Sequence, residues 1–255
     1  MPEVTDDEFE ELADDDTLVK EIHESPPILK SKITSKNGFQ EDRDLVGEIK
    51  KGELAIDGRD EPVFFRASSI GFCLRMQWYS WMGINSGMND DTGFRTGAAD
   101  HGNWIHDMII RKITRAGKWR GDNVYIADRK LQFNGHIDVV IYHNELAVVE
   151  IKSMNRFKYL NYIRSPEHHH RLQLQSYLMM KKLDVGYLLP YNKDSDQWTL
   201  LKTYSNKDEQ NEILNRLKLL RYYTSKNIRP ERLGIRPKDN KECGWCKFRR
   251  ICWSE

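Results

Sequence analysis

Two acidic residues and a lysine lie close together in the stretch GHIDVVIYHNELAVVEIK, residues 135–152. If Asn144 lies at the turn of a hairpin, Asp138 falls directly opposite Glu150, with Cβ atoms roughly 4.5 to 5.5 Å apart. Lys152 follows Glu150 by two residues, so its side chain points to the same face of the strand. Two carboxylates at that separation can share one divalent cation. The stretch therefore predicts an oxygen-rich metal site with an ammonium group beside it.

The neighbours of these charged residues support that interpretation. Asp138 and Glu150 are embedded in runs of valine and isoleucine. An ionised group in such surroundings needs a partner or a metal ion. The spacing by itself also arises by chance, and acidic residues on exposed strands are common. The apolar context favours a catalytic site over a solvent-facing strand.

Four cysteines form a second pattern. Cys243, Cys246 and Cys252 give C-x2-C-x5-C, and 169 residues separate Cys73 from Cys243. Three clustered thiols and one distant thiol can supply the ligands of an iron-sulfur cluster or of a zinc ion, and residue chemistry leaves both open. An unrelated buried cysteine is the alternative for Cys73, whereas chance explains the triplet poorly.

The first pattern, in which GHID is followed by VVEIKS, resembles the core of the PD-(D/E)xK nuclease superfamily. More narrowly, it resembles the RecB-type exonuclease branch. That branch carries an upstream G-x3-H motif, matched here by Gly102 and His106, and a downstream Q-x3-Y motif, matched by Gln173 and Tyr177. Ile137 stands where the superfamily label has proline, and the branch tolerates an apolar residue there.

The resemblance implies a hydrolase that uses Mg or Mn. The metal ligands that it implies are His106, Asp138, Glu150 and the backbone carbonyl of Ile151. Lys152 would orient the attacking water or stabilise developing charge on the phosphate. Gln173 and Tyr177 are four residues apart, hence on one face of a helix, and would brace the lysine and the DNA strand.

The cysteines are arranged as in the iron-sulfur subset of RecB-type nucleases, which includes the CRISPR-associated adaptation exonuclease and AddB-like nucleases. This similarity implies a [4Fe-4S] cluster, with zinc as the alternative. The residues that would bind it are Cys73, Cys243, Cys246 and Cys252. Such a cluster would staple the N- and C-terminal helical parts together around the catalytic core. The resemblance covers roughly residues 66–255.

Hydrophobic periodicity predicts the elements that position these residues. Helices are expected over residues 68–82, 100–116, 167–183 and 206–227, with Cys73 inside the first and His106 inside the second. Strands are expected over residues 124–142, 146–152, 184–192 and 197–204. This order predicts an α/β protein. The resemblance implies a restriction-endonuclease-like core, with a central mixed β-sheet flanked by helices.

Composition and charge limit the class of protein. No window approaches the roughly 18 consecutive apolar residues of a membrane helix, and the first 30 residues contain no apolar signal region, so a cytoplasmic protein is expected. The whole chain carries +1 and residues 1–16 carry nine acids without lysine or arginine, so the remaining residues carry +10. A basic body favours phosphate backbones as partners, although most charge excesses only solvate a surface.

The domain expectation has two parts. Residues 1–60 are expected to be an acidic, largely disordered extension, because they lack periodicity and contain Pro26 and Pro27. Residues 61–255 are expected to form the nuclease domain, including the cysteine cluster over residues 243–252.

Together these features predict a metal-dependent deoxyribonuclease, an exonuclease acting on single-stranded DNA ends. Protein partners in recombination, repair or CRISPR adaptation are compatible with the resemblance. The alternative is a catalytically inactive iron-sulfur protein that binds nucleic acid in a repair or CRISPR adaptation complex. The intact set of Asp138, Glu150 and Lys152 argues against it, because a pure binding protein does not need these three residues.

Overall fold

The computed structural model describes residues 64–86, 93–234 and 241–254, with only the backbone described for residues 93–100 and 241. These residues belong to one compact unit, Val63–Glu255. The acidic extension predicted over residues 1–60 lies outside the described residues.

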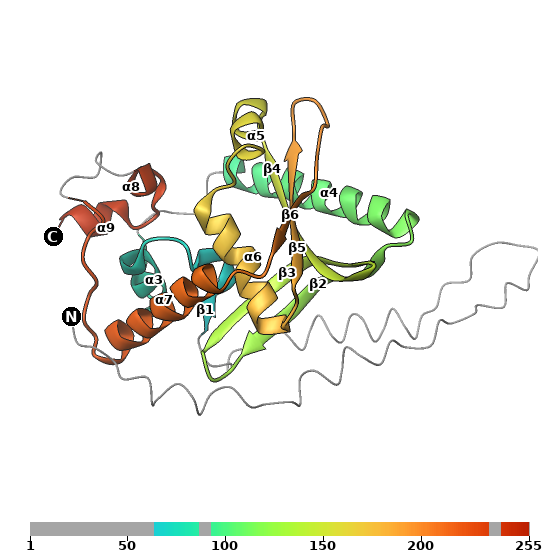
Figure 1. Ribbon diagram of the computed structural model, residues 1–255. Coiled ribbons are helices and arrows are strands. Elements are labelled where there is room, and N and C mark those ends of the chain that lie inside the picture. The colour runs from blue at the N-terminus through green and yellow to red at the C-terminus, as the bar shows by residue number, and fades with distance from the viewer. Residues whose placement is uncertain (1–63, 87–92, 235–240, 255) are drawn as a thin grey trace, which may run out of the picture. The chain divides into compact units, whose positions relative to one another are not determined.

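A mixed β-sheet forms the centre of the described chain (Figure 1). Its strands are β1 (Phe65–Arg66), β2 (Trp119–Asp128), β3 (Phe133–His143), β4 (Glu145–Met154), β5 (Val185–Asn192) and β6 (Leu201–Tyr204). Their order is β1-β3-β4-β5-β6, and β2 also pairs with β3. The β1–β3 and β4–β5 pairs are parallel, and the other pairs are antiparallel. The predicted α/β class with a central mixed sheet between helices is confirmed.

The β3–β4 hairpin has the predicted register. Its ladder runs from His143↔Glu145 to Val139↔Val149, with Asn144 alone at the turn. Asn144 has a φ of 67°. Asparagine tolerates this left-handed conformation better than most residues, which explains why the turn falls there.

One edge of β3 is shared by two strands. Phe133 pairs with β1 on the edge opposite β2, and Val139 pairs with β4 on that same edge. The intervening residues 135–138 have no ladder partner on this edge. The pairing of β3 with β4 therefore ends next to Asp138, where the two strands move apart.

Helices cover both faces of the sheet (Figure 1). On one face, Ile105 and Ile109 of α4 (Gly93–Arg115) pack on Val139, Val149 and Leu189. On the other face, Leu174 of α6 (His168–Lys181) packs on Gly186, where an added Cβ would lie 3.0 Å from that leucine. Since Val185 faces α4 and Gly186 faces α6, alternate residues of β5 contact opposite layers.

Two helices connect β4 to the parallel strand β5. These are α5 (Arg156–Tyr162), whose N-cap is Asn155, and α6. The Asn155 side chain accepts a hydrogen bond from the Lys158 amide, which satisfies one of the free donors at the start of α5. Asn206 caps α7 (Lys207–Ser225) in the same way. Helix α7 packs against α6 and against α3 (Leu74–Trp81).

A small second core joins α3 to the C-terminal helices α8 (Lys241–Trp245) and α9 (Arg249–Ser254). It consists of Trp78, Tyr79 and Phe248, with Cys246 and Cys252 packed against it. This core brings the region of Cys73 to the C-terminal cysteines.

The structure corrects three sequence-based expectations. Cys73 is not inside a helix: residues 67–69 form a short 3-10 turn, η4 (Ala67–Ser69), and α3 starts after Cys73, which is its N-cap. Residues 124–142 are not one strand, because the chain turns between β2 and β3 and Gln132 has a φ of 51°. The predicted strand over residues 197–204 is shorter, since β6 covers only its end.

Helix α5 was not predicted, because seven residues give little periodicity.

Within the described residues, no helix is both long and apolar enough to cross a membrane.

Candidate active site

The hairpin register brings Asp138 and Glu150 together. Each lies one step beyond the last ladder pair, Val139↔Val149, where the strands separate. The side chain of Asp138 occupies this separation, since its Oδ2 accepts a hydrogen bond from the backbone N–H of Ile151 at 2.7 Å. A side-chain carboxylate thus replaces a strand carbonyl as the acceptor for that amide.

Lys152 and His106 complete this group of four. The Nζ of Lys152 lies 2.6 Å from Oε1 of Glu150, and Nδ1 of His106 lies 3.7 Å from Oδ1 of Asp138. His106 follows Ile105, whose burial in the core fixes the position of α4 over the sheet. We refer to His106, Asp138, Glu150 and Lys152 as the carboxylate site.

Glu150 is the most buried member of the carboxylate site, with 1% of its side chain exposed. Its Oε1 is paired with Lys152, but its Oε2 is buried and has no hydrogen-bond partner. A buried carboxylate oxygen without a partner is energetically costly. The donor set of two carboxylates and one imidazole therefore fits a bound divalent cation, which would compensate that oxygen.

Burial also changes the protonation of the site. It raises the pKa of Glu150, and the nearby Asp138 adds to this increase while Lys152 opposes it. Burial likewise raises the pKa of Asp138. For Lys152, burial lowers the pKa, but the nearby carboxylates, Glu150 foremost, together outweigh this effect and the net pKa is raised. Burial lowers the pKa of His106, which favours the neutral imidazole that metals bind.

Ile151 takes part only through its backbone. Its side chain is 1% exposed and belongs to the core under α4. Its N–H binds Asp138, and a backbone hydrogen bond joins it to His106. The Ile151 backbone therefore lies beside Asp138 and His106, two of the metal ligands that the resemblance implies together with it.

Gln173 and Tyr177 lie on one face of α6 and bond to each other. The amide Nε2 of Gln173 donates to the Tyr177 hydroxyl at 2.8 Å, and both residues are buried. Burial raises the pKa of Tyr177, and the charges of Glu150 and Asp138 raise it further. The charges of the carboxylate site therefore disfavour the ionised form of Tyr177.

Gly135 allows Tyr177 to approach β3. A Cβ added to Gly135 would lie 2.7 Å from Cε1 of Tyr177 and 3.0 Å from Cβ of Ala67. Gly135 was part of the recognised GHID motif, but its steric role was not predicted. Only the packed structure shows that a side chain would not fit there.

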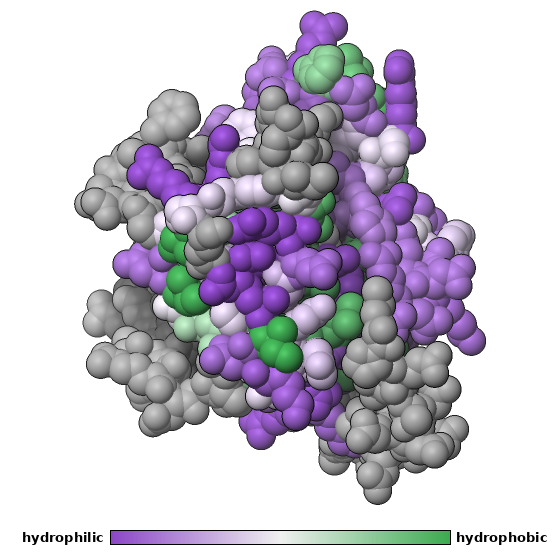
Figure 2. Space-filling model, turned by 90° about the vertical axis from the view of Figure 1, so that its left-hand side faces the viewer, coloured by the Kyte–Doolittle hydropathy of each residue, from purple (hydrophilic) through white to green (hydrophobic). Residues whose placement is uncertain are grey.

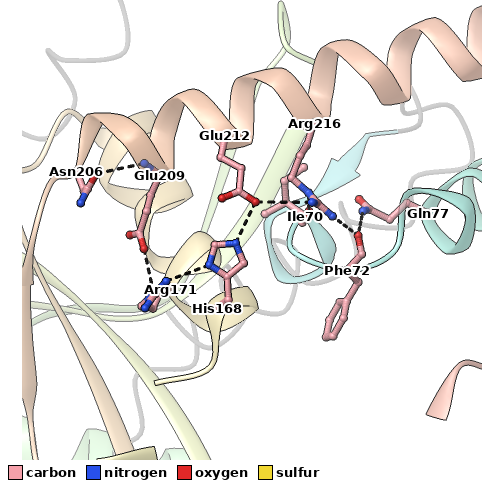
Figure 3. Close-up of polar contacts among 9 residues, drawn as sticks. All are labelled: Ile70, Phe72, Gln77, His168, Arg171, Asn206, Glu209, Glu212 and Arg216. Atoms are coloured by element: carbon pink, nitrogen blue, oxygen red, sulfur yellow. Dashed lines mark hydrogen bonds and ion pairs between the residues drawn. The ribbon is translucent and has the colours of Figure 1, made fainter. Parts of the chain in front are cut away.

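The start of α6 is tied to α7 (Figure 3). His168 Nε2 lies 3.0 Å from Oε1 of Glu212, and Arg171 Nε lies 2.9 Å from Oε1 of Glu209. These contacts fix the helix that carries Gln173 against α7.

The same network reaches the segment before Cys73. Arg216 of α7 donates to the carbonyl oxygen of Ile70 at 2.6 Å and also to that of Phe72 (Figure 3). Gln77 of α3 donates to the Phe72 carbonyl at 2.9 Å. The region of Cys73 is therefore held by side chains from two helices.

The cysteines form a group at the junction of α3, α8 and α9. Cys73 and Cys246 interact electrostatically, as do Cys246 and Cys252, and Cys243 interacts with both of the latter. The N–H of Cys73 also donates to Oε2 of Glu242 at 3.2 Å, across 169 positions of sequence. In the described chain the four cysteines form no disulfide, and Cys246 and Cys252 pack against the small core of Trp78, Tyr79 and Phe248.

Three further residues near the carboxylate site were not assigned to a site from the sequence: Glu167, His169 and His170. Their metal-binding atoms all lie within 4.8 Å of one another. Burial lowers the pKa of both imidazoles, and Lys152 contributes to the decrease. The signal in the sequence that could have found them is the run of three histidines at residues 168–170.

Basic and aromatic side chains are exposed near the C-terminal cysteines. Lys247, Arg249 and Arg250 are exposed, and Trp245 is 90% exposed. A shallow hollow on α9, lined by Arg249, Arg250, Trp253 and Ser254, includes no residue of the carboxylate site. Figure 2, which views the side of the molecule that lies to the left in Figure 1, shows mostly hydrophilic residues with separate hydrophobic patches.

Known proteins share this fold. The family model described as the PD-(D/E)XK nuclease superfamily matches residues 94–253, more than half of the chain. No curated protein sequence matches the chain. A crystal structure of SSO0001 has a TM-score of 0.55 and 19% sequence identity, covering 84% of this chain and 98% of that one.

Two exonuclease structures are also similar, at lower TM-scores. The alkaline exonuclease LHK-Exo from Laribacter hongkongensis has a TM-score of 0.48 and 14% identity, covering 65% of this chain and 89% of that one. A phage-related exonuclease from Haemophilus somnus 129PT has a TM-score of 0.45 and 13% identity, covering 66% and 96%. The match to the family model, over a region that contains the whole carboxylate site, shows that the chain belongs to the PD-(D/E)XK nuclease superfamily.

Proposed function

We propose that this protein is a divalent-metal-dependent DNA nuclease that hydrolyses phosphodiester bonds. The observation that carries the proposal is the convergence of Asp138, Glu150 and Lys152 where β3 and β4 separate, with one buried Glu150 oxygen lacking any hydrogen bond. Membership of a nuclease superfamily supports the same conclusion. The catalytically inactive alternative leaves this costly group of buried charges without a purpose.

The carboxylate site would hold Mg or Mn through Asp138, Glu150 and His106, with the Ile151 carbonyl as a further ligand. When bound, the ion supplies Lewis-acid activation of the phosphate and of a water molecule. Lys152 stays protonated because Glu150 lies beside it, so its ammonium can stabilise negative charge on the phosphate or orient the water.

Gln173 and Tyr177 would act as positioning residues for this chemistry. Their mutual hydrogen bond fixes the tyrosine hydroxyl, and Tyr177 packs against Gly135 of the strand that carries Asp138. From there, the pair can brace Lys152 and the DNA strand. This role rests on the Q-x3-Y resemblance together with the position of α6.

The preference for single-stranded ends, and hence exonuclease action, rests on the RecB-type motifs. Exposed Trp245, Arg249 and Arg250 can stack on bases and neutralise phosphates, which is how single strands are bound without sequence preference. Protein partners in recombination, repair or CRISPR adaptation remain part of the proposal on the resemblance alone.

The four cysteines would bind a [4Fe-4S] cluster. A tetrahedral zinc site with Zn–S bonds of about 2.3 Å needs sulfur atoms about 3.8 Å apart. In the described chain, no three cysteines have their sulfur atoms all within 4.8 Å of one another. The choice of a [4Fe-4S] cluster over zinc therefore rests on the resemblance of the C-x2-C-x5-C arrangement to iron-sulfur nucleases. Protein purified without oxygen should then be brown and contain iron, whereas colourless protein with one bound zinc would contradict the cluster.

The nuclease proposal is tested with end-labelled single- and double-stranded DNA, in the presence of Mg, Mn or EDTA. We expect metal-dependent shortening from single-stranded ends by the wild-type protein and none by Glu150→Gln. Glu145→Gln is the matched control, because Glu145 lies on the same strand but is exposed beside the hairpin turn. Equal cleavage by wild-type and Glu150→Gln would reject the site.

A further inference from the structure

Three potential metal ligands meet at the start of α6. The Nε2 of His169 and Nδ1 of His170 lie 3.4 and 3.5 Å from Oε2 of Glu167. One donor atom from each residue lies within 4.8 Å of the other two. None of the three belongs to the carboxylate site, to the Q-x3-Y motif or to the cysteine group.

The central oxygen of this group is available to a ligand. Oε1 of Glu167 is already paired with the ammonium of Lys158 at 3.2 Å. Oε2 is buried and has no hydrogen-bond partner, although two imidazole nitrogens lie beside it. A buried carboxylate oxygen between two imidazoles would gain a partner if a cation bound there.

Neighbouring residues fix both imidazole rings. The Phe72 ring packs on His169 with centroids 4.4 Å apart, and the Tyr162 hydroxyl lies 3.1 Å from Nδ1 of His170. Gly71 lies so close to the helix that an added Cβ would come within 2.5 Å of the His169 Cα. Packing of this kind orients the His169 ring. Tyr162 contacts the same His170 nitrogen that faces Glu167, so a cation bound at that nitrogen would displace this contact.

The donor types indicate which cation would bind. Magnesium and calcium prefer oxygen ligands, whereas imidazole suits zinc and similar transition metals. Two histidines and one glutamate also form known three-residue zinc sites, which leave a fourth position open. We propose that Glu167, His169 and His170 bind one transition-metal dication of the zinc class, separate from the metal of the carboxylate site.

The positive charge of Lys152 does not prevent a cation from binding at Glu167, His169 and His170. Lys152 would repel a cation at His169 and His170, but its charge is paired with Glu150 at 2.6 Å. A cation held here would tie together the first turn of α6, whose later turns carry Gln173 and Tyr177. It would therefore stiffen the helix that borders the carboxylate site.

The test measures zinc bound per chain after dialysis of the full-length protein against Zn²⁺ alone. We compare wild-type protein with Glu167→Gln, His169→Gln and His170→Gln. Cysteines also bind zinc, so the decisive quantity is the difference between proteins with the same four cysteines. His168→Gln is the matched control, because His168 neighbours the site but pairs with Glu212 and Arg171 instead.

We expect each of the three variants to lose one zinc ion per chain and His168→Gln to lose none. Unchanged zinc content in the three variants would overturn the proposal, and so would an equal loss in His168→Gln, which would indicate binding by any histidine of the run. If His170→Gln fails to fold, Glu167→Gln decides, since the Glu167 side chain is 36% exposed. Glu150→Gln should keep this zinc while losing DNA cleavage, so a failure of either proposal can be recognised separately.

Discussion

The carboxylate site and the cysteine group are built in opposite ways. Asp138 and Glu150 are 12 positions apart and are aligned by one hairpin whose register depends on a single turn at Asn144. Cys73 and Cys243 are separated by most of the described chain and meet only because α3 packs on the C-terminal helices. The first site concentrates buried charge within one hairpin, and the second joins distant segments. The comparison therefore predicts that catalysis and stability depend on different residues.

The largest expected effect is on catalysis. Asp138→Ala removes one carboxylate of the proposed metal site and the acceptor of the Ile151 amide. We expect DNA cleavage to fall by roughly 1000-fold, the scale of losing a central electrostatic group, while the cysteine group stays intact. Single-turnover cleavage of end-labelled DNA measures this. If iron or zinc at the cysteines were lost as well, the two sites would not be independent.

Lys152→Met should separate metal binding from cleavage. The substitution removes the ammonium beside Glu150 but keeps much of the side-chain volume. We expect cleavage to fall by roughly 100- to 1000-fold with Mn²⁺ still bound. Electron paramagnetic resonance of added Mn²⁺ reports the binding. Loss of the ion together with activity would make Lys152 a structural partner of Glu150 instead.

Cys246→Ser should affect stability more than chemistry. Cys246 packs on the small core of Trp78, Tyr79 and Phe248, and a metal bound by the cysteines would contribute to folding. We expect the free energy of unfolding to fall by about 3 kcal/mol or more, measured by denaturant titration of protein purified without oxygen. A variant as stable as the wild type would remove the proposed staple.

Gly135→Ala tests the packing between β3 and α6. The new methyl group would press on Tyr177 and Ala67, and overpacking of this kind costs about 1 to 3 kcal/mol. Gly102→Ala is the control. Gly102 lies within α4, and the nearest atom to its added Cβ is Oγ of Ser153 at 4.0 Å, so the methyl group has room. That change should stabilise the helix by about 0.5 to 1 kcal/mol. Similar effects of the two changes would contradict the steric role of Gly135.

The smallest effect concerns pH. Without metal, burial raises the pKa of Glu150 above its ordinary value of 4.5. The folded protein then keeps a proton that the unfolded chain has released, so the free energy of unfolding falls as the pH rises above 4.5. We expect Glu150→Gln to weaken this dependence and to be no less stable than the wild type near neutral pH. Denaturant titrations at several pH values check this, and an unchanged slope would contradict it.

The same contrast explains what the sequence could predict. The hairpin register and the pairing of Asp138 with Glu150 follow from local alternation and one turn residue, so both could be derived before the structure was known. The N-cap position of Cys73 could not, because apolar spacing continued through Ile70 while the chain there is fixed by Arg216 of a distant helix. Glu167, His169 and His170 converge through packing against α5 and the Phe72 segment, which periodicity does not encode.

The most direct test of the carboxylate site is a crystal soaked in Mn²⁺ and measured for anomalous scattering. The proposed function predicts a manganese peak bonded at about 2.0 to 2.3 Å to Asp138 and to the free Oε2 of Glu150, near His106. The peak should be absent in Glu150→Gln and present in Lys152→Met. Manganese bound elsewhere in the chain, with none between these two carboxylates, would contradict the assignment of this site as the metal centre of the nuclease.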